Sequence, residues 1–154
     1  MFMTNPRGAS VLVAEDNAVN MEVAKFHLAG LGCAVEGVEN GALAVEVLRR
    51  RAFDVVLMDC QMPVMDGFEA LQHIRAQFAS GNKSPALRPP VVIAVTAADD
   101  DETRRHCLAA GFDGFLSKPF SKQQLNDAML SIGNAATSAG AFAARRTSTA
   151  QQRR

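Results

Sequence analysis

Four apolar segments of the sequence end in residues whose side chains can do chemistry. The segments and the residues that follow them are SVLVA (10–14) with Glu15 and Asp16, FDVVLM (53–58) with Asp59, VVIAV (91–95) with Thr96, and GFLS (114–117) with Lys118. Three of these segments have the continuous apolar composition of strands that are buried on both faces. A buried strand that ends on a lone acid, as FDVVLM does on Asp59, fixes that acid rigidly in one place.

Parallel strands would bring these residues together, because ligands of open α/β sheets bind outside the carboxyl ends of the strands. Carboxylates crowded at that edge repel one another, so one must take up a proton or a cation must neutralise them. Mg²⁺ suits such a site, since it accepts oxygen ligands and few protein ligands. Lys118 can hold an anionic oxygen and Thr96 can donate a hydroxyl proton. The set of residues therefore indicates phosphoryl transfer, in which catalysis is mainly positioning and charge neutralisation.

Helices that alternate with the strands must position these residues. A further strand is predicted at CAVEGV (33–38), and helices are predicted at about 19–31, 41–51, 68–78, 99–111 and 121–132. The segment 80–90 has the Gly, Ser and Pro content of a loop. No internal repeat is present. The alternation predicts an α/β fold with a five-stranded parallel sheet, doubly wound as (βα)5 with right-handed crossovers.

The spacing of apolar residues predicts one apolar face on four of the five helices. The four predicted faces are Val19, Val23, Phe26 and Gly30; Ala44, Val47 and Leu48; Leu71, Ile74 and Phe78; and Leu125, Ala128, Met129 and Ile132. Asp99, Asp100 and Asp101 are candidate N-caps, and Gly111 is a suitable residue to end the same helix. Ser121 and Gln124 fit a capping box at the start of the last helix.

Length and composition predict one domain followed by a tail. The chain has 154 residues, of which 9–133 carry the alternating pattern. Residues 134–154 contain four of the sixteen Lys and Arg but none of the sixteen Asp and Glu, which predicts a disordered basic tail. Three irregularly spaced cysteines indicate reduced thiols. No stretch is apolar enough to span a membrane, and the N-terminus lacks the layout of a signal peptide, so a cytoplasmic protein is expected.

The segments VAEDN, LMDCQMPVMDG, VTA and SKPF resemble, in this order and spacing, the receiver domain of two-component response regulators. The resemblance covers residues 9–133, and the wording LMDCQMPVMDG is most similar to receivers attached to hybrid sensor kinases. It implies the flavodoxin-like receiver fold, with strand order 2-1-3-4-5. It also implies a phosphorelay function, with a sensor histidine kinase or a histidine phosphotransfer protein as the partner that supplies the phosphoryl group.

The resemblance assigns the acids their roles. It implies that Asp59 is the phosphoacceptor, and that Mg²⁺ is held by Asp16, Asp59 and the backbone carbonyl of Gln61. Glu15, which stands where the family more often has aspartate, would act mostly through water. A chain of this kind is expected to be no enzyme, although it would assist its own phosphorylation and dephosphorylation. No DNA-binding domain is expected on it.

The resemblance also implies how the phosphoryl group is sensed. Thr96 and Lys118 would hold the phosphoryl oxygens, and Pro119 would follow a cis peptide bond that aims the lysine inward. Thr96 would move towards the phosphoryl group and let Phe115 turn inward, a population shift between two states. Taken alone, Thr96 could equally cap the following helix, and Phe115 could be an ordinary core residue.

Two other functions share some of these features. Haloacid dehalogenase-like phosphatases also combine an aspartate nucleophile with Mg²⁺, a Thr or Ser and a Lys. Their nucleophile is followed two residues later by a second acid, whereas this chain has Gln61 there, an amide without acid–base capacity. The third possibility is a receiver-like interaction module that is never phosphorylated, which the intact set of Asp16, Asp59, Thr96 and Lys118 disfavours.

Overall fold

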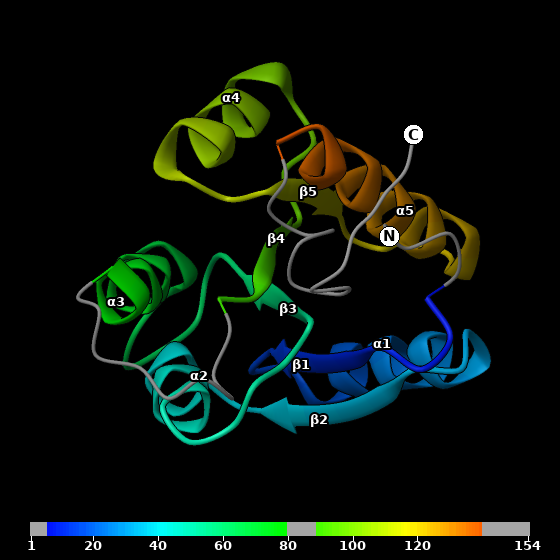
Figure 1. Cartoon of the computed structure of the whole chain (residues 1–154), viewed down its shortest axis with the longest axis horizontal. Helices are drawn as coiled ribbons and strands as arrows, with labels where there is room; N and C mark the ends of the chain where they lie inside the picture. Colours follow the sequence, from blue (N-terminus) through cyan, green and yellow to red (C-terminus); the bar gives the residue numbers. More distant parts are fainter. Residues whose placement is uncertain (1–5, 80–88, 140–154) are drawn as a thin grey trace.

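Strands and helices alternate along the whole described chain. The computed structural model describes residues 6–79 and 89–139, of which 132–139 are described through their backbone only. The elements are β1 (Ser10–Ala14), α1 (Ala18–Gly30), β2 (Ala34–Val38), α2 (Gly41–Leu48), β3 (Val55–Asp59), α3 (Gly67–Ala79), β4 (Val91–Thr96), α4 (Asp101–Ala110), β5 (Gly114–Ser117) and α5 (Lys122–Ala139) (Figure 1). The five predicted strand–helix units are therefore confirmed.

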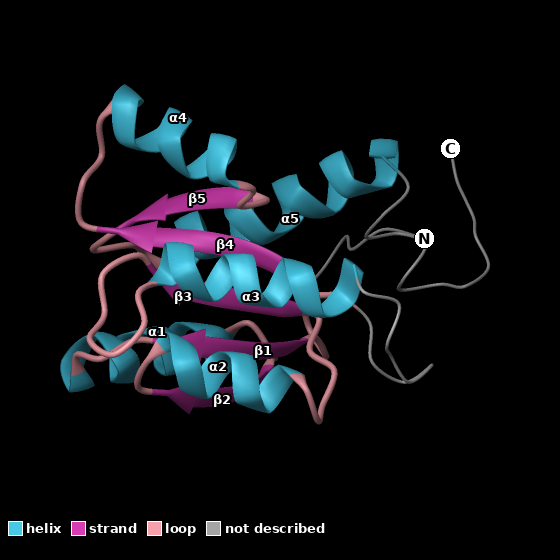
Figure 2. Ribbon diagram, turned by 90° about the vertical axis from the view of Figure 1, so that its left-hand side faces the viewer, coloured by secondary structure: helices cyan, strands magenta, loops and turns pink. Residues whose placement is uncertain are grey.

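All five strands form one parallel sheet in the order β2-β1-β3-β4-β5 (Figure 1). The strand order implied by the resemblance is thus confirmed. Helices α1 and α5 cover one face, and α2, α3 and α4 cover the other (Figure 2). The central strands β3 and β4 are buried along their whole length, as their continuous apolar sequences predicted.

The chain enters and leaves the sheet at the same edge. Strand β1 begins at Ser10 on the amino edge, and α5 runs from Lys122 at the carboxyl edge back past the amino edge to Ala139 (Figure 2). The predicted domain ended at residue 133, but α5 continues to Ala139, because alanines in this stretch favour helix. The remainder of the predicted tail, 140–154, and most of the predicted loop, 80–88, lie outside the described residues.

The predicted apolar face of α1 is not the buried one. Val19 and Phe26 are 71% and 76% exposed, while Met21, Ala24 and Leu28 pack into the core. At 100° per residue the two sets lie on opposite sides of the helix, so α1 has two apolar faces. Spacing alone could not decide between them. The sheet contacts the face that has the small Ala24 at its centre, which leaves Val19, Val23 and Phe26 facing outward.

Capping residues fix the ends of several helices. The Asp100 side chain accepts a hydrogen bond from the Thr103 N–H at 2.7 Å, and Gly111 ends α4 in a left-handed conformation with φ 112°. Ser121 and Gln124 form the predicted capping box, with reciprocal bonds of 3.1 and 2.9 Å. Asn17 starts α1, since its side-chain oxygen accepts a hydrogen bond from the Asn20 N–H at 2.9 Å.

Within the described part of the chain, no helix combines the length and the apolar character needed to cross a membrane. All three cysteines are free thiols. Cys60 and Cys107 lie in the core with their Sγ atoms 3.9 Å apart, and burial holds the pKa of the Cys60 thiol far above its ordinary value. Both therefore behave as small core residues.

Candidate functional site

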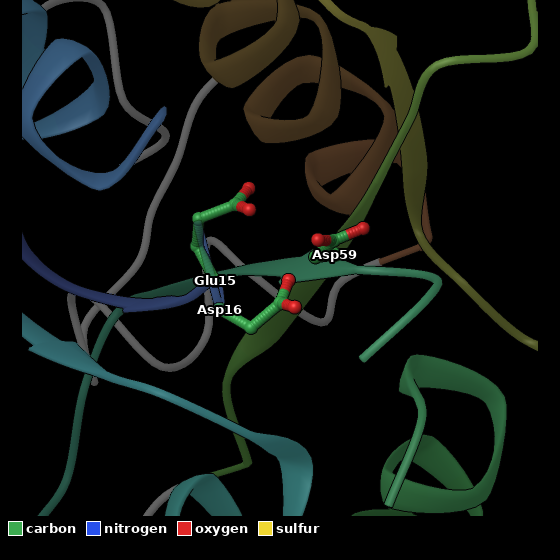
Figure 3. Close-up of side chains that lie close together, drawn as sticks. All are labelled: Glu15, Asp16 and Asp59. Atoms are coloured by element: carbon green, nitrogen blue, oxygen red, sulfur yellow. The ribbon is translucent and has the colours of Figure 1, made fainter. Parts of the chain in front are cut away.

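Three acids meet at the carboxyl edge of the sheet. Glu15 and Asp16 follow β1, and Asp59 is the last residue of β3, the neighbouring strand (Figure 3). One oxygen from each of the three carboxylates lies within 4.8 Å of the other two. Glu15 and Asp59 are buried, whereas Asp16 is exposed at the mouth of the cluster. The parallel sheet has thus assembled the acids that the sequence placed at strand ends.

Asp59 is an unusual acid because of its surroundings. Burial raises its pKa to about 6, opposed by the hydrogen bond that its Oδ1 accepts from the Gln61 N–H at 3.1 Å. The charge of Glu15 raises this pKa further and that of Lys118 lowers it. Desolvation is therefore the main reason that the carboxylate is held in a high-energy form near neutral pH.

Lys118 links the two buried acids. Its Nζ lies 3.3 Å from Oε1 of Glu15 and 3.4 Å from Oδ2 of Asp59, and its side chain is 19% exposed. Burial alone would lower the pKa of Lys118, but the charges of Asp59 and Glu15 outweigh it and raise that pKa. The ammonium is therefore retained at the site. The Lys118–Pro119 peptide bond is cis, as the resemblance implied.

Glu15 is held in place from its own loop. Its Oε2 accepts a hydrogen bond from the Asn17 N–H at 3.1 Å, while Oε1 contacts Lys118. This orientation turns the longer side chain towards Lys118. Strand ends alone predicted that Glu15 and Lys118 lie at the same edge, but this direct contact could not be predicted, because it depends on how the two side chains turn.

Thr96 ends β4 and is buried beside the acids. Its Oγ1 accepts a hydrogen bond from the Ala98 N–H at 3.2 Å, so the hydroxyl is tied to its own loop. Asp100, and not Thr96, caps α4, which excludes the capping role that the sequence left open. Phe115 is half-buried and pairs with Ala94 of β4. Ala94 comes two residues before Thr96, so the side chains of Phe115 and Thr96 lie on the same face of the sheet.

The end of β3 is fixed by the close approach of α3. A Cβ at Gly67 would overlap the carbonyl oxygen of Asp59 and lie 2.9 Å from Cα of Cys60. The Gly67 N–H donates to the Cys60 carbonyl at 3.1 Å. Glycine is therefore required here by proximity, and this contact holds the Asp59 backbone against the first turn of α3.

A cavity joins the acids to helix α1. It has a volume of about 80 Å³ and lies beside Asp59 and Lys118, with Asn20 and Val23 of α1 in its wall. Val23 also belongs to the outward apolar face of that helix, whose concave surface is lined by Val19, Phe26 and His27. The site and the apolar face of α1 thus form one continuous surface, which the sequence did not predict.

The donor set of the acid cluster fits a hard divalent cation. Three carboxylate oxygens gather around one point, and two of them belong to buried acids whose charges Lys118 alone does not balance. Mg²⁺ prefers oxygen ligands and keeps several waters, and Asp16 on the exposed side leaves room for them. Among the described residues, no other group of His, Cys, Asp and Glu has this arrangement.

Comparisons with known proteins agree with this geometry. The model of the response regulator receiver domain family matches residues 11–130. Sensor protein GacS of Pseudomonas syringae pv. syringae is 39% identical over 124 residues, which cover 80% of this chain and 13% of that protein. Probable histidine kinase 4 of Oryza sativa subsp. japonica is 39% identical over 137 residues, covering 79% of this chain and 14% of that protein. The chain therefore spans only a small part of the curated relatives it matches.

Solved structures are similar in both fold and sequence. The receiver domain of sensor histidine kinase PA1611 from Pseudomonas aeruginosa PAO1, with a magnesium ion in its active-site cleft, is 39% identical with a TM-score of 0.64, covering 77% of this chain and 91% of that one. The receiver domain of the histidine kinase CKI1 from Arabidopsis thaliana, in complex with Mg²⁺ and BeF3⁻, is 33% identical with a TM-score of 0.66, covering 78% and 87%. The structure of the Saccharomyces cerevisiae receiver domain of Ssk1 with the phosphotransfer protein Ypd1 gives 26% identity and a TM-score of 0.74, covering 87% and 92%.

Proposed function

This chain belongs to the response regulator receiver domain family, and from that premise we propose that its Asp59 accepts a phosphoryl group from a phosphohistidine on a partner protein. A receiver of this family serves two-component signal transduction. The observation that carries the assignment to Asp59 is its position, buried between two further carboxylates and 3.4 Å from the Lys118 ammonium.

The chemistry asked of the residues is simple. An Asp59 oxygen attacks phosphorus, a P–O bond forms, and the P–N bond to the donor imidazole breaks. The departing nitrogen keeps the electron pair of that bond and takes up a proton. Lys118 can donate hydrogen bonds to a phosphoryl oxygen as readily as to the acids it contacts now, and the Thr96 hydroxyl retains its proton for the same purpose.

We assign the cation site to Asp16, Asp59 and the backbone carbonyl of Gln61, with Glu15 acting through water. Mg²⁺ bound there would neutralise the acids and the charge of the phosphoryl oxygens. The three clustered carboxylates support this assignment, as does the magnesium ion in the cleft of the similar PA1611 domain. The raised pKa of Asp59 also supports the cation site, because a buried carboxylate whose ionised form is unfavourable gains most from binding a cation.

Removal of the metal should abolish phosphorylation. We expect the intact protein to gain one phosphoryl group when incubated with acetyl phosphate and Mg²⁺, and to gain none when EDTA is present. Intact-protein mass spectrometry measures the difference, and excess Mg²⁺ added after EDTA should restore the adduct. Equal adduct with and without EDTA would contradict the assigned cation site.

We propose that the protein is no enzyme towards external substrates. Gln61 stands two residues after Asp59, where a haloacid dehalogenase-like phosphatase has its acid–base carboxylate, and the side chain of Gln61 is exposed. Sustained turnover of p-nitrophenyl phosphate by the wild type, lost in Asp59→Asn, would favour that phosphatase instead. Its absence, together with one stable equivalent of phosphoryl group, supports the receiver.

We propose that the donor is a sensor histidine kinase or a histidine phosphotransfer protein that docks on the outward face of α1. Val19 and Phe26 are largely exposed, and this face continues into the cavity beside Asp59. A protein that presents a phosphohistidine to Asp59 must contact the surface around the acids. The structural similarity to Ssk1, described in complex with Ypd1, supports a partner of this class.

Phe26→Asp should slow phosphorylation by a protein donor but not phosphorylation by a small-molecule donor. A charge in the centre of an apolar contact is expected to slow phosphotransfer from a phosphorylated histidine phosphotransfer protein by about 10-fold or more. The rate with acetyl phosphate should stay unchanged, since Phe26 is far from the acids along α1. Leu108→Asp is the matched control, an exposed apolar residue on α4. An equal loss in both variants, or a loss with acetyl phosphate, would exclude this docking face.

We place this reaction in the cytoplasm, where histidine kinases meet their receivers. The three free thiols are in keeping with a reducing compartment. We further propose that Thr96 and Phe115 form the switch, in which Thr96 leaves its bond to Ala98 for the phosphoryl group and Phe115 turns inward. The shared sheet face of the two residues supports that coupling.

A further inference from the structure

Helix α4 is attached to the rest of the domain by few contacts. Of its residues Asp101–Ala110, Cys107 alone has a buried side chain, against Cys60 in the core. The C-terminal end of α4 is held from α3, because Arg75 donates to the Gly111 carbonyl at 2.7 Å and to Asp113 at 3.0 Å. The N-terminal half therefore depends on its own side chains for its position.

Arg104 supplies those contacts. Its guanidinium carbon lies 4.6 Å from the centre of the Phe115 ring, which is the geometry of a cation–π interaction. Its Nη2 also donates to Oδ1 of Asp99 at 3.4 Å. One side chain thus joins the aromatic residue of β5 to the loop between β4 and α4.

That loop begins at Thr96. The Thr96 hydroxyl is bonded to Ala98, and Asp99 is the next residue. Phe115 lies on the same sheet face as Thr96, because its partner Ala94 comes two residues before Thr96 in β4. Arg104 therefore connects Phe115 to the loop that holds the Thr96 hydroxyl, and movement of this loop towards Asp59 would change the Asp99–Arg104 contact. Phe115 likewise cannot turn inward while Arg104 keeps its place on the ring.

We propose that Arg104 is a brake on the phosphorylation switch. By stacking on Phe115 and pairing with Asp99, it stabilises the conformation in which Thr96 is tied to its own loop. This proposal rests on the proposed function, namely that Asp59 is the phosphoacceptor and that Thr96 and Phe115 form the switch. Arg104 is a positioning residue, since it acts through Phe115 and the loop and does not touch the acids.

The expected size of the brake follows from its exposure. The Arg104 and Asp99 side chains are 49% and 60% exposed, so the ion pair adds little. A cation–π contact at such a site contributes about a 2- to 5-fold factor to the equilibrium between the two states. For a ligand that binds only the switched state, the apparent dissociation constant equals the intrinsic dissociation constant divided by the fraction of molecules in that state. Loss of the brake should therefore tighten binding by about 2- to 5-fold.

Beryllofluoride with Mg²⁺, titrated calorimetrically into the full chain, tests this. Arg104→Gln, which keeps length and polarity but removes the charge, should bind about 2- to 5-fold more tightly than wild type. Arg105→Gln, the same change on the next residue of α4, should bind as wild type does. In a Phe115→Leu background, which has no ring, Arg104→Gln should have no effect. A damaged structure would weaken binding, so the expected gain distinguishes the brake from a merely structural role.

The outcomes separate the two proposals. If wild type binds beryllofluoride and Arg104→Gln binds with the same or lower affinity, the brake is wrong and the phosphoacceptor role stands. An equal gain in Arg104→Gln and Arg105→Gln would assign the effect to net charge and also overturn the brake. If wild type neither binds beryllofluoride nor is phosphorylated by acetyl phosphate, the proposed function itself fails.

Discussion

Asp59→Asn is expected to abolish phosphorylation and, in the absence of metal, to make the protein more stable. The loss of function should exceed about 100-fold, because the amide cannot act as the nucleophile and no other carboxylate occupies the end of β3. The gain in stability follows from the cost of an ionised carboxylate at this buried position. This one substitution therefore distinguishes the role of Asp59 in phosphorylation from its effect on the stability of the fold.

The sign of the stability effect comes from the pKa of Asp59. Burial raises that pKa from 3.8 to about 6, so between these values the folded state binds more protons than the unfolded state. The free energy of unfolding of the metal-free wild type should therefore fall as pH rises from about 4 to 6, and the cost should remain at higher pH. A shift of this size corresponds to about 3 kcal/mol, and water at the mouth of the site reduces it to about 1–2 kcal/mol.

Thermal unfolding in EDTA at pH 7.5 and at pH 4 measures this effect. Asp59→Asn should melt about 3–6 °C above wild type at pH 7.5 and much closer to it at pH 4. Added Mg²⁺ should stabilise the wild type and leave Asp59→Asn nearly unchanged, since a ligand stabilises only the state that binds it. Asp66→Asn is the control, because asparagine also caps a helix, as Asp66 does for Glu69, and Asp66 lies outside the acid cluster. A variant that melts below wild type in EDTA at pH 7.5 would refute the argument from desolvation.

Among the described glycines, Gly67 is the one at which we expect substitution by alanine to be most destabilising. The added Cβ would overlap the Asp59 carbonyl oxygen and press on Cα of Cys60, both of them backbone atoms that cannot rotate away. We expect a loss of about 3 kcal/mol, or about 10 °C in melting temperature. At temperatures at which the variant is still folded, its phosphorylation by acetyl phosphate should also be slower, because relief of the overlap moves Asp59.

Gly30→Ala provides the matched comparison for Gly67→Ala. Its Cβ would meet only the flexible side chain of Lys122, with Cδ at 3.3 Å and Nζ at 3.7 Å. Since alanine favours helix more than glycine does, this variant should be neutral or slightly stabilised. Circular dichroism melts of both variants give the answer. Equal melting temperatures would mean that α3 shifts without cost and that Asp59 is not held by this contact.

Local and periodic features of the sequence predicted most of the fold. Continuous apolar runs such as VVIAV identified buried strands, and Gly111 and the Ser121–Gln124 box identified helix ends, because each acts within a few residues. The faces of α1 could not be predicted in the same way. Two apolar stripes on one helix look alike in sequence, and only the sheet decides which of them is covered.

The site followed a similar division. The strand ends predicted that Asp59, Glu15, Thr96 and Lys118 lie together, because parallel strands share a carboxyl edge. The contacts among them could not be predicted: the turn of Glu15 towards Lys118, the bond that ties Thr96 to Ala98, and the stacking of Arg104 on Phe115. Each depends on the relative position of segments far apart in the chain, or on a rotamer chosen by packing.

The placement of both ends of the domain at the amino edge has a consequence for tethering. Ser10 enters and α5 leaves on the side of the sheet away from the acids (Figure 2). A covalently attached domain would therefore approach Asp59 over a distance set by its linker, without obstructing the carboxyl edge. The effective concentration of an attached donor would depend on linker length and stiffness, rising to the millimolar range for short flexible linkers that reach and falling to almost nothing for those that do not. With the same set of side chains, the geometry of the tether would then decide whether the phosphoryl group comes from an attached donor or from a separate molecule.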